Sequence, residues 1–139
     1  MHFQRHALML AATDVAAAKG LYTGLLGLEC SIDLGWFVSL VPPADRPQGF
    51  ELSLCAIDHP SLPRALQRSP SGVVLAFEVD DVRRVYTEFQ NKEAEILLPL
   101  TDEPWGQRHF YAAGADGAAI DVFQGIAPDP QWMAEQGLA

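Results

Sequence analysis

Apolar positions in the first half of the chain follow two different periods. An apolar run over Ala7–Ala12 predicts a buried strand, and Thr13-Asp14 behind it offers side chains that can cap a helix. From Val15 to Leu26 apolar side chains recur every three or four residues, which is typical of an amphipathic helix. Three further apolar runs predict strands over Leu28–Ile32, Trp36–Val41 and Phe50–Ile57.

The second half repeats this order. Gly72–Val79 predicts a strand, and Asp80-Asp81 opens a helix whose apolar face extends to Phe89. Tyr22 and Phe89 are separated by the same shift as Asp14 and Asp81, which supports an internal duplication. Three more strands and a short C-terminal helix are predicted over Ile96–Leu100, Arg108–Ala113, Ala118–Phe123 and Pro128–Gln136.

A proline-rich segment separates the two halves. Asp58–Ser71 holds Pro60, Pro63 and Pro70 and predicts a linker. We therefore expect one domain over residues 1–139, with a first module over about 1–58, a linker over 59–71, a second module over about 72–125 and a tail over 126–139.

Composition narrows the class of partner. A net charge of −9 and a pI near 4.6 argue against binding to nucleic acid or to an anionic membrane surface. No run of about 20 apolar residues predicts a membrane span, and no secretory signal is visible. Cys30 and Cys55 lie in apolar runs, so we expect both to be buried thiols in a cytoplasmic protein.

Three segments resemble one known superfamily. They are Asp14 to Leu-Gly-Leu-Glu29, the Phe-Glu-Val-Asp-Asp run that ends at Val82, and Pro104-Trp-Gly-Gln-Arg-His-Phe110 continued to Asp121. In order and spacing they resemble the vicinal-oxygen-chelate superfamily of glyoxalases, bleomycin-resistance proteins and extradiol dioxygenases. The resemblance implies an α+β fold of two βαβββ modules, whose curled mixed sheets form a cleft for a small molecule, and a homodimer.

The resemblance also implies where a metal would bind. In metal-dependent members, His, Gln or Glu side chains on the strands hold a divalent cation that polarises vicinal oxygens of the substrate. The matching positions here are Ala7, Glu51, Val74 and Asp121. Ala7 and Val74 have no donor atom, and His6 should point to the opposite face of its strand. We therefore expect no transition metal, while Glu51 and Asp121 could hold a divalent cation such as Mg²⁺ weakly.

Three residues are candidates for acid–base chemistry. If Glu51 and Asp121 face each other in an apolar cleft, they would share a proton, and they could act as acid and base or bind a cationic or hydroxylated ligand. The alternative is that each carboxylate pairs separately with an arginine or with backbone N–H groups. His109 lies in a central strand candidate, where it would be either a hydrogen-bonded structural residue or a proton-transfer group.

Aromatic and polar side chains near the expected cleft are candidates for ligand binding. Trp36 and Phe37 would line the pocket or pack in the core, and Trp105 could cover the cleft mouth. Arg108 would contact the ligand or pair with Asp102 or Glu103. The predicted ligand-binding residues are Trp36, Phe37, Trp105, Gln107, Arg108 and Tyr111.

Two functions fit these observations. The first is a glyoxalase/bleomycin-resistance-like protein that binds a small organic molecule without a transition metal, which the lost donor positions favour. The alternative is a metal-dependent lyase, isomerase or dioxygenase that uses Glu51 and Asp121, which the retained carboxylates favour. The fold alone does not decide between them. A protein-interaction role has no positive feature in this sequence.

Overall fold

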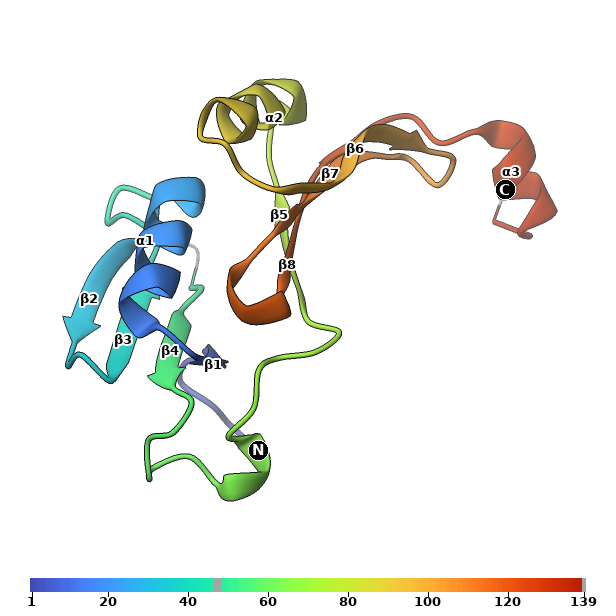
Figure 1. Cartoon of the computed structure of the whole chain (residues 1–139). Helices are drawn as coiled ribbons and strands as arrows, with labels where there is room; N and C mark the ends of the chain where they lie inside the picture. The colour runs from blue at the N-terminus through green and yellow to red at the C-terminus, as the bar shows by residue number, and fades with distance from the viewer. Residues whose placement is uncertain (47–48, 139) are drawn as a thin grey trace. The chain divides into compact units, whose positions relative to one another are not determined.

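The chain forms two compact units in a computed structural model that describes residues 1–46 and 49–138 (Figure 1). The first unit contains residues Met1–Gly72 and the short segment Gly114–Gly117. The second contains Val73–Ala113 and the chain from Ala118 onward. Each unit holds a four-stranded mixed sheet, and the fold is α+β, as the sequence predicts.

The first unit is a βαβββ module with the strand order β1-β4-β3-β2. Strands β1 and β4 are parallel and the other neighbours are antiparallel. Its elements are β1 (Leu8–Ala12), α1 (Val15–Leu26), β2 (Glu29–Asp33), β3 (Phe37–Val41), β4 (Leu52–Ala56) and the short 3₁₀ helix η1 (Arg64–Leu66).

Helix α1 begins and ends where its sequence provides caps. The Asp14 carboxylate accepts a hydrogen bond from the Ala17 amide at 2.9 Å. Gly27 ends the helix at φ 66°, a left-handed conformation that favours glycine, and its amide bonds to the Thr23 carbonyl. The helix packs against β3 and β4 and buries Tyr22 and Ala18. The first core lies at this contact between helix and sheet.

A loop far along the sequence completes the first unit. The 3₁₀ helix η2 (Ala115–Gly117) contacts α1, and the Ala115 amide donates a hydrogen bond to the Tyr22 hydroxyl at 3.0 Å. The Asp116 carboxylate accepts hydrogen bonds from both the amide and the hydroxyl of Thr13. Asp116 adopts φ 54°, a rare conformation for a residue with a side chain. These bonds hold the loop against the start of α1.

The second unit repeats the module, with the strand order β5-β8-β7-β6 and with β5 parallel to β8. This agreement between the sheets confirms the two βαβββ modules predicted from the repeated pattern. The elements are β5 (Val74–Glu78), α2 (Val82–Asn91), β6 (Ile96–Glu103), β7 (Gln107–Ala113), β8 (Ala119–Gly125) and α3 (Pro130–Glu135).

The alternation of side chains along the strands builds the second core. Phe110 and Ile120 are fully buried and Val122 nearly so, on the face of the sheet that α2 covers. Phe89 of α2 meets Phe110 edge-on, with ring centroids 5.1 Å apart. Asp81 caps this helix through the Arg84 amide, as the sequence predicts.

The chain after β8 runs beside the β6–β7 turn. The Ile126 amide donates to the Gly106 carbonyl at 2.9 Å, and the Asp129 amide donates to the Pro104 carbonyl at 2.8 Å. Gly106 has φ 103°, and a Cβ atom there would lie 2.9 Å from the Ile126 carbonyl oxygen. A glycine at this position therefore permits both the turn and the close approach of the tail.

Two local expectations are corrected. Cys30 is exposed, whereas Cys55 is buried as expected. Cys30 lies in β2, an edge strand whose residues are all exposed, so an apolar run did not imply burial there. Strand β6 extends beyond the predicted Leu100 to Glu103, because its last residues pair with the start of β7. In the parts of the chain that the structure describes, no helix has the length and apolar character needed to cross a membrane.

The Tyr22 hydroxyl yields a prediction for stability. We expect Tyr22→Phe to lower the free energy of unfolding by about 1 kcal/mol, because the Ala115 amide loses its acceptor. Burial raises the pKa of Tyr22 above its usual value of 10.0, so the folded state holds the phenolic proton more tightly than the unfolded state. The stability that Tyr22 contributes is fully present at pH values below 10.0, the usual pKa of tyrosine. It is lost as the pH rises through the higher pKa that Tyr22 has in the folded state.

Urea denaturation at neutral and alkaline pH measures the effect. The difference in stability between the native protein and Tyr22→Phe should shrink at alkaline pH. Tyr86→Phe is the matched control, since the Tyr86 ring packs on Phe110 but its hydroxyl makes no hydrogen bond among the described residues. An equal loss of stability in both variants would show that the bond to the loop contributes nothing specific.

Candidate functional site

The candidate site lies on the face of the second sheet opposite to α2. In the register of β6, β7 and β8, His109 stands opposite Thr101 and Phe123, and Tyr111 stands opposite Asp121. Because successive residues of a strand point to opposite faces, these side chains share one face. We call it the His109 face, and its residues are Thr101, Glu103, Gln107, His109, Tyr111, Asp121 and Phe123.

A buried imidazole between two carboxylates forms the centre of this face. Nδ1 of His109 lies 3.0 Å from Oδ1 of Asp121, and Nε2 lies 3.0 Å from Oε1 of Glu103. His109 is 4% exposed and Asp121 is 8% exposed, whereas Glu103 is half-buried. Both ring nitrogens are therefore engaged, which fixes the orientation of the imidazole. We call Glu103, His109 and Asp121 the carboxylate–imidazole trio.

Aromatic rings surround the trio. The Tyr111 and Trp105 rings meet the His109 ring edge-on, with centroid distances of 5.4 Å and 6.4 Å. The Trp105 indole N–H donates a hydrogen bond to Oε1 of Gln107 at 3.0 Å. Trp132 of α3 packs against Trp105, with ring centroids 6.1 Å apart. Trp105 is 47% exposed, so it offers a free aromatic surface beside a buried polar centre.

Arg108 points away from the His109 face. Its guanidinium donates to both carboxylate oxygens of Asp102, and the second of these bonds measures 2.6 Å. These bonds hold the pKa of Asp102 below its usual value. Of the two partners that the sequence left open, Asp102 is the one that the structure pairs with Arg108, while Glu103 pairs with His109.

Glu51 lies in the first unit with partners of its own. It directly precedes β4, its Oε1 accepts a hydrogen bond from the buried Ser39 hydroxyl at 2.8 Å, and its Oε2 lies 3.6 Å from the exposed Arg5 guanidinium. Asp121 instead has His109 as its partner in the second unit. The contact of Glu51 with Arg5 is of the kind that the alternative expected, whereas the partner of Asp121 is a histidine, which the alternative did not include. The mutual pairing of Glu51 with Asp121 stays a prediction.

Trp36 and Phe37 lie together at the start of β3, with ring centroids 5.8 Å apart. Trp36 is 37% exposed and Phe37 is half-buried, so Trp36 is not a core residue. The Trp36 ring also stacks on the His59 ring, with centroids 3.7 Å apart and an angle of 5° between the ring planes. No sequence pattern singles out His59, because nothing in a proline-rich linker indicates which side chain will pack against a ring.

The donor set does not fit a transition metal. Ala7 and Val74 supply no ligand atom, and one oxygen of each retained carboxylate already accepts a hydrogen bond, from Ser39 for Glu51 and from His109 for Asp121. Among residues 1–46 and 49–138, no three His, Cys, Asp or Glu side chains lie together as a metal ion requires. Zinc, nickel or iron would need nitrogen or sulfur donors at these positions.

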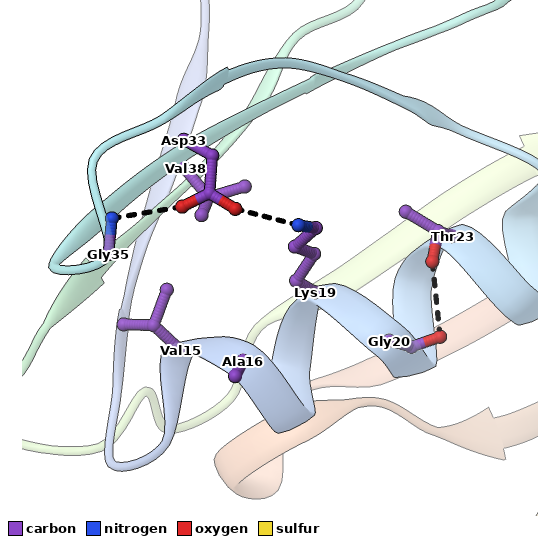
Figure 2. A pocket seen from close by; sticks show the side chains of 8 residues that line it. All are labelled: Val15, Ala16, Lys19, Gly20, Thr23, Asp33, Gly35 and Val38. Atoms are coloured by element: carbon purple, nitrogen blue, oxygen red, sulfur yellow. Dashed lines mark hydrogen bonds and ion pairs between the residues drawn. The ribbon is translucent and has the colours of Figure 1, made fainter.

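A separate pocket of about 390 Å³ lies in the first unit, between α1 and the β2–β3 hairpin (Figure 2). At its rim the Lys19 ammonium donates to Asp33 at 2.7 Å, and the Gly35 amide donates to the same carboxylate at 2.9 Å (Figure 2). These bonds lower the pKa of Asp33. No predicted site residue lines this pocket, and its charged side chains neutralise each other.

Glu103 is the site residue whose role the sequence missed. The sequence suggested it only as a partner for Arg108. It could have been found from alternation, because Glu103 and Asp102 are neighbours on a strand and must point to opposite faces. Alternation did not cover these two residues because the apolar run predicts a strand that ends at Leu100, whereas β6 extends to Glu103.

The trio predicts a large effect on stability for one substitution. We expect His109→Leu to lower the free energy of unfolding by about 2 kcal/mol, because two largely buried carboxylates lose their shared donor. Arg108→Leu on the opposite face should lower the free energy of unfolding much less than His109→Leu does, since its partner Asp102 is exposed and the ion pair is screened by solvent. Chemical denaturation of both variants tests the contrast, and equal losses would refute it.

The comparisons with known proteins identify the family. Residues 5–127 match the family model of the glyoxalase-like domain. A search of curated proteins finds no match for this chain.

Solved structures share the fold. A glyoxalase/bleomycin resistance protein/dioxygenase from Nocardioides is 23% identical, with a TM-score of 0.74 over 91% of this chain and 85% of that one. A member of the glyoxalase/bleomycin resistance protein/dioxygenase superfamily from Sphaerobacter thermophilus is 21% identical, with a TM-score of 0.70 over 89% of this chain and 98% of that one. TnmS3, an antibiotic-binding protein from a Streptomyces species, is 21% identical, with a TM-score of 0.67 over 89% and 97%. This chain belongs to the glyoxalase-like domain family, within the vicinal-oxygen-chelate superfamily.

Proposed function

We propose that this protein binds a small planar organic molecule on the His109 face, without a transition metal. The observation that carries the proposal is the carboxylate–imidazole trio, a buried polar centre that is already oriented and is flanked by Trp105 and Tyr111. Small-molecule sites commonly combine aromatic walls with a few well-placed polar groups. An antibiotic-binding protein with the same fold supports this class of function.

Trp36 and Phe37 lie in the first unit, where Trp36 offers an exposed ring and Phe37 lies beside it. Their contact with a ligand stays a prediction from the sequence and is not part of the proposal for the His109 face. Gln107 positions the Trp105 indole through its side-chain oxygen. We do not include Arg108, which the sequence suggested as a ligand contact, because Asp102 holds its guanidinium on the opposite face of the sheet.

Ligand screening by thermal unfolding tests the proposal. We expect planar aromatic compounds to stabilise metal-free protein, by about 2.7 kcal/mol when the free ligand is about a hundredfold above its Kd. The Trp105→Ala variant should lose this stabilisation because it removes the exposed ring. Leu66→Ala is the control, since it also truncates an exposed apolar side chain but lies in η1 of the first unit.

The same screen distinguishes the metal-free proposal from the metal-dependent alternative. Protein treated with a chelator and protein incubated with Mn²⁺, Ni²⁺, Zn²⁺ or Fe²⁺ should bind ligand equally and should retain no stoichiometric metal in elemental analysis. Stoichiometric metal, together with ligand binding that requires it, would overturn the proposal. That outcome would favour a lyase, isomerase or dioxygenase in which Glu51 and Asp121 hold the cation.

We further propose that the protein is a homodimer in the reducing cytoplasm. The superfamily resemblance supports the dimer, and the two free thiols Cys30 and Cys55 suit a reducing compartment. Light scattering on the purified protein should give twice the chain mass of 15.2 kDa. A mass that stays at the single-chain value at all protein concentrations would refute the dimer.

A further inference from the structure

The groups of the trio make its charge negative. A neutral imidazole offers one N–H donor and one acceptor nitrogen, and an ionised carboxylate only accepts. Both ring nitrogens lie 3.0 Å from a carboxylate oxygen. A neutral ring between two ionised carboxylates leaves the trio negative, and a trio with one further proton, on the ring or on a carboxyl group, is still negative.

The open positions of the trio are acceptors. Oδ2 of Asp121 and Oε2 of Glu103 make no hydrogen bond among the described residues, whereas the other oxygen of each is held by His109. Since no buried side-chain polar atom in this part of the chain lacks a partner, both oxygens must reach the surface. The exposed fractions of these side chains, 22% for Glu103 and 11% for Asp121, agree with that placement. His109 has no N–H left to donate.

Arg108, the basic residue next to His109 in β7, does not balance the charge of the trio. Arg108 is turned to the opposite face and is held by Asp102. The negative charge also reaches the neighbouring ring, because the pKa of Tyr111 is raised first by burial and then by the charges of Asp121 and Glu103. The exposed Trp105 ring lies close to this charge, and an aromatic face attracts cations.

We propose that the ligand of the His109 face is a planar molecule with a cationic group that donates N–H hydrogen bonds, such as an amidinium, a guanidinium or a protonated amine. The cation would bond to the open oxygens of Glu103 and Asp121 while the ring of the ligand packs on Trp105. A charge-assisted hydrogen bond is stronger than a neutral one, whereas an anion at the trio would meet two carboxyl groups that carry charge of its own sign. This inference rests on the function proposed above and specifies its ligand.

A series of probes that share one ring and differ in charge tests the proposal. Naphthamidine is a cation at neutral pH, naphthamide is neutral and naphthoate is an anion. In calorimetric titrations of the unaltered protein, naphthamidine should bind about tenfold more tightly than naphthamide, and naphthoate should not bind. Glu103→Gln should remove about that tenfold advantage and leave the affinity for naphthamide unchanged, because the amide keeps an oxygen for His109 but carries no charge.

Glu88→Gln is the matched control, since it makes the same change on the exposed surface of α2 in the same unit. It should leave the affinity for all three probes unchanged.

If the amidine and the amide bind equally and Trp105→Ala abolishes both, the proposed function stands and the preference for a cation is overturned. Absence of binding by all three probes also overturns the preference, and the broader screen with Trp105→Ala then decides the proposed function separately. The charge series itself needs no variant, so a variant that fails to fold does not obscure it.

Discussion

The alternation of side chains along a β-strand is the constraint on which the rest of the second unit depends. Each βαβββ module has a sheet and one long helix, and that helix covers one face of the sheet. Phe110 points toward α2 and is fully buried, whereas His109 beside it in the chain points to the other face. Strand geometry therefore separates the core from the candidate site, and the two can change independently.

The polar centre on the His109 face is stable because its members provide hydrogen-bond partners for one another. A buried imidazole without partners would be costly, and so would two carboxylates facing each other. With His109 between Asp121 and Glu103, both ring nitrogens have partners and the like charges are bridged. The arrangement leaves one oxygen of each carboxylate open, which is the chemistry that a bound molecule would meet.

The resemblance to the superfamily implies metal ligands at four positions, and two of these are Ala7 and Val74, which have no donor atom. At a third position, the hydrogen bond to His109 occupies an oxygen of Asp121. In the first unit, Ser39 occupies an oxygen of Glu51 in a similar way. One oxygen of each of these two carboxylates is thus held by a protein side chain, which suits a site that recognises an organic molecule directly.

The sequence by itself determined the modules and the helix caps at Asp14 and Asp81, because helix and strand periods and capping are local properties. Only the tertiary structure decided which carboxylate meets His109, which of Asp102 and Glu103 pairs with Arg108, and that Cys30 is exposed. These outcomes depend on the register between strands and on which strand forms the edge of a sheet. Both are set by pairing between segments distant in the chain, for which no local pattern carries a signal.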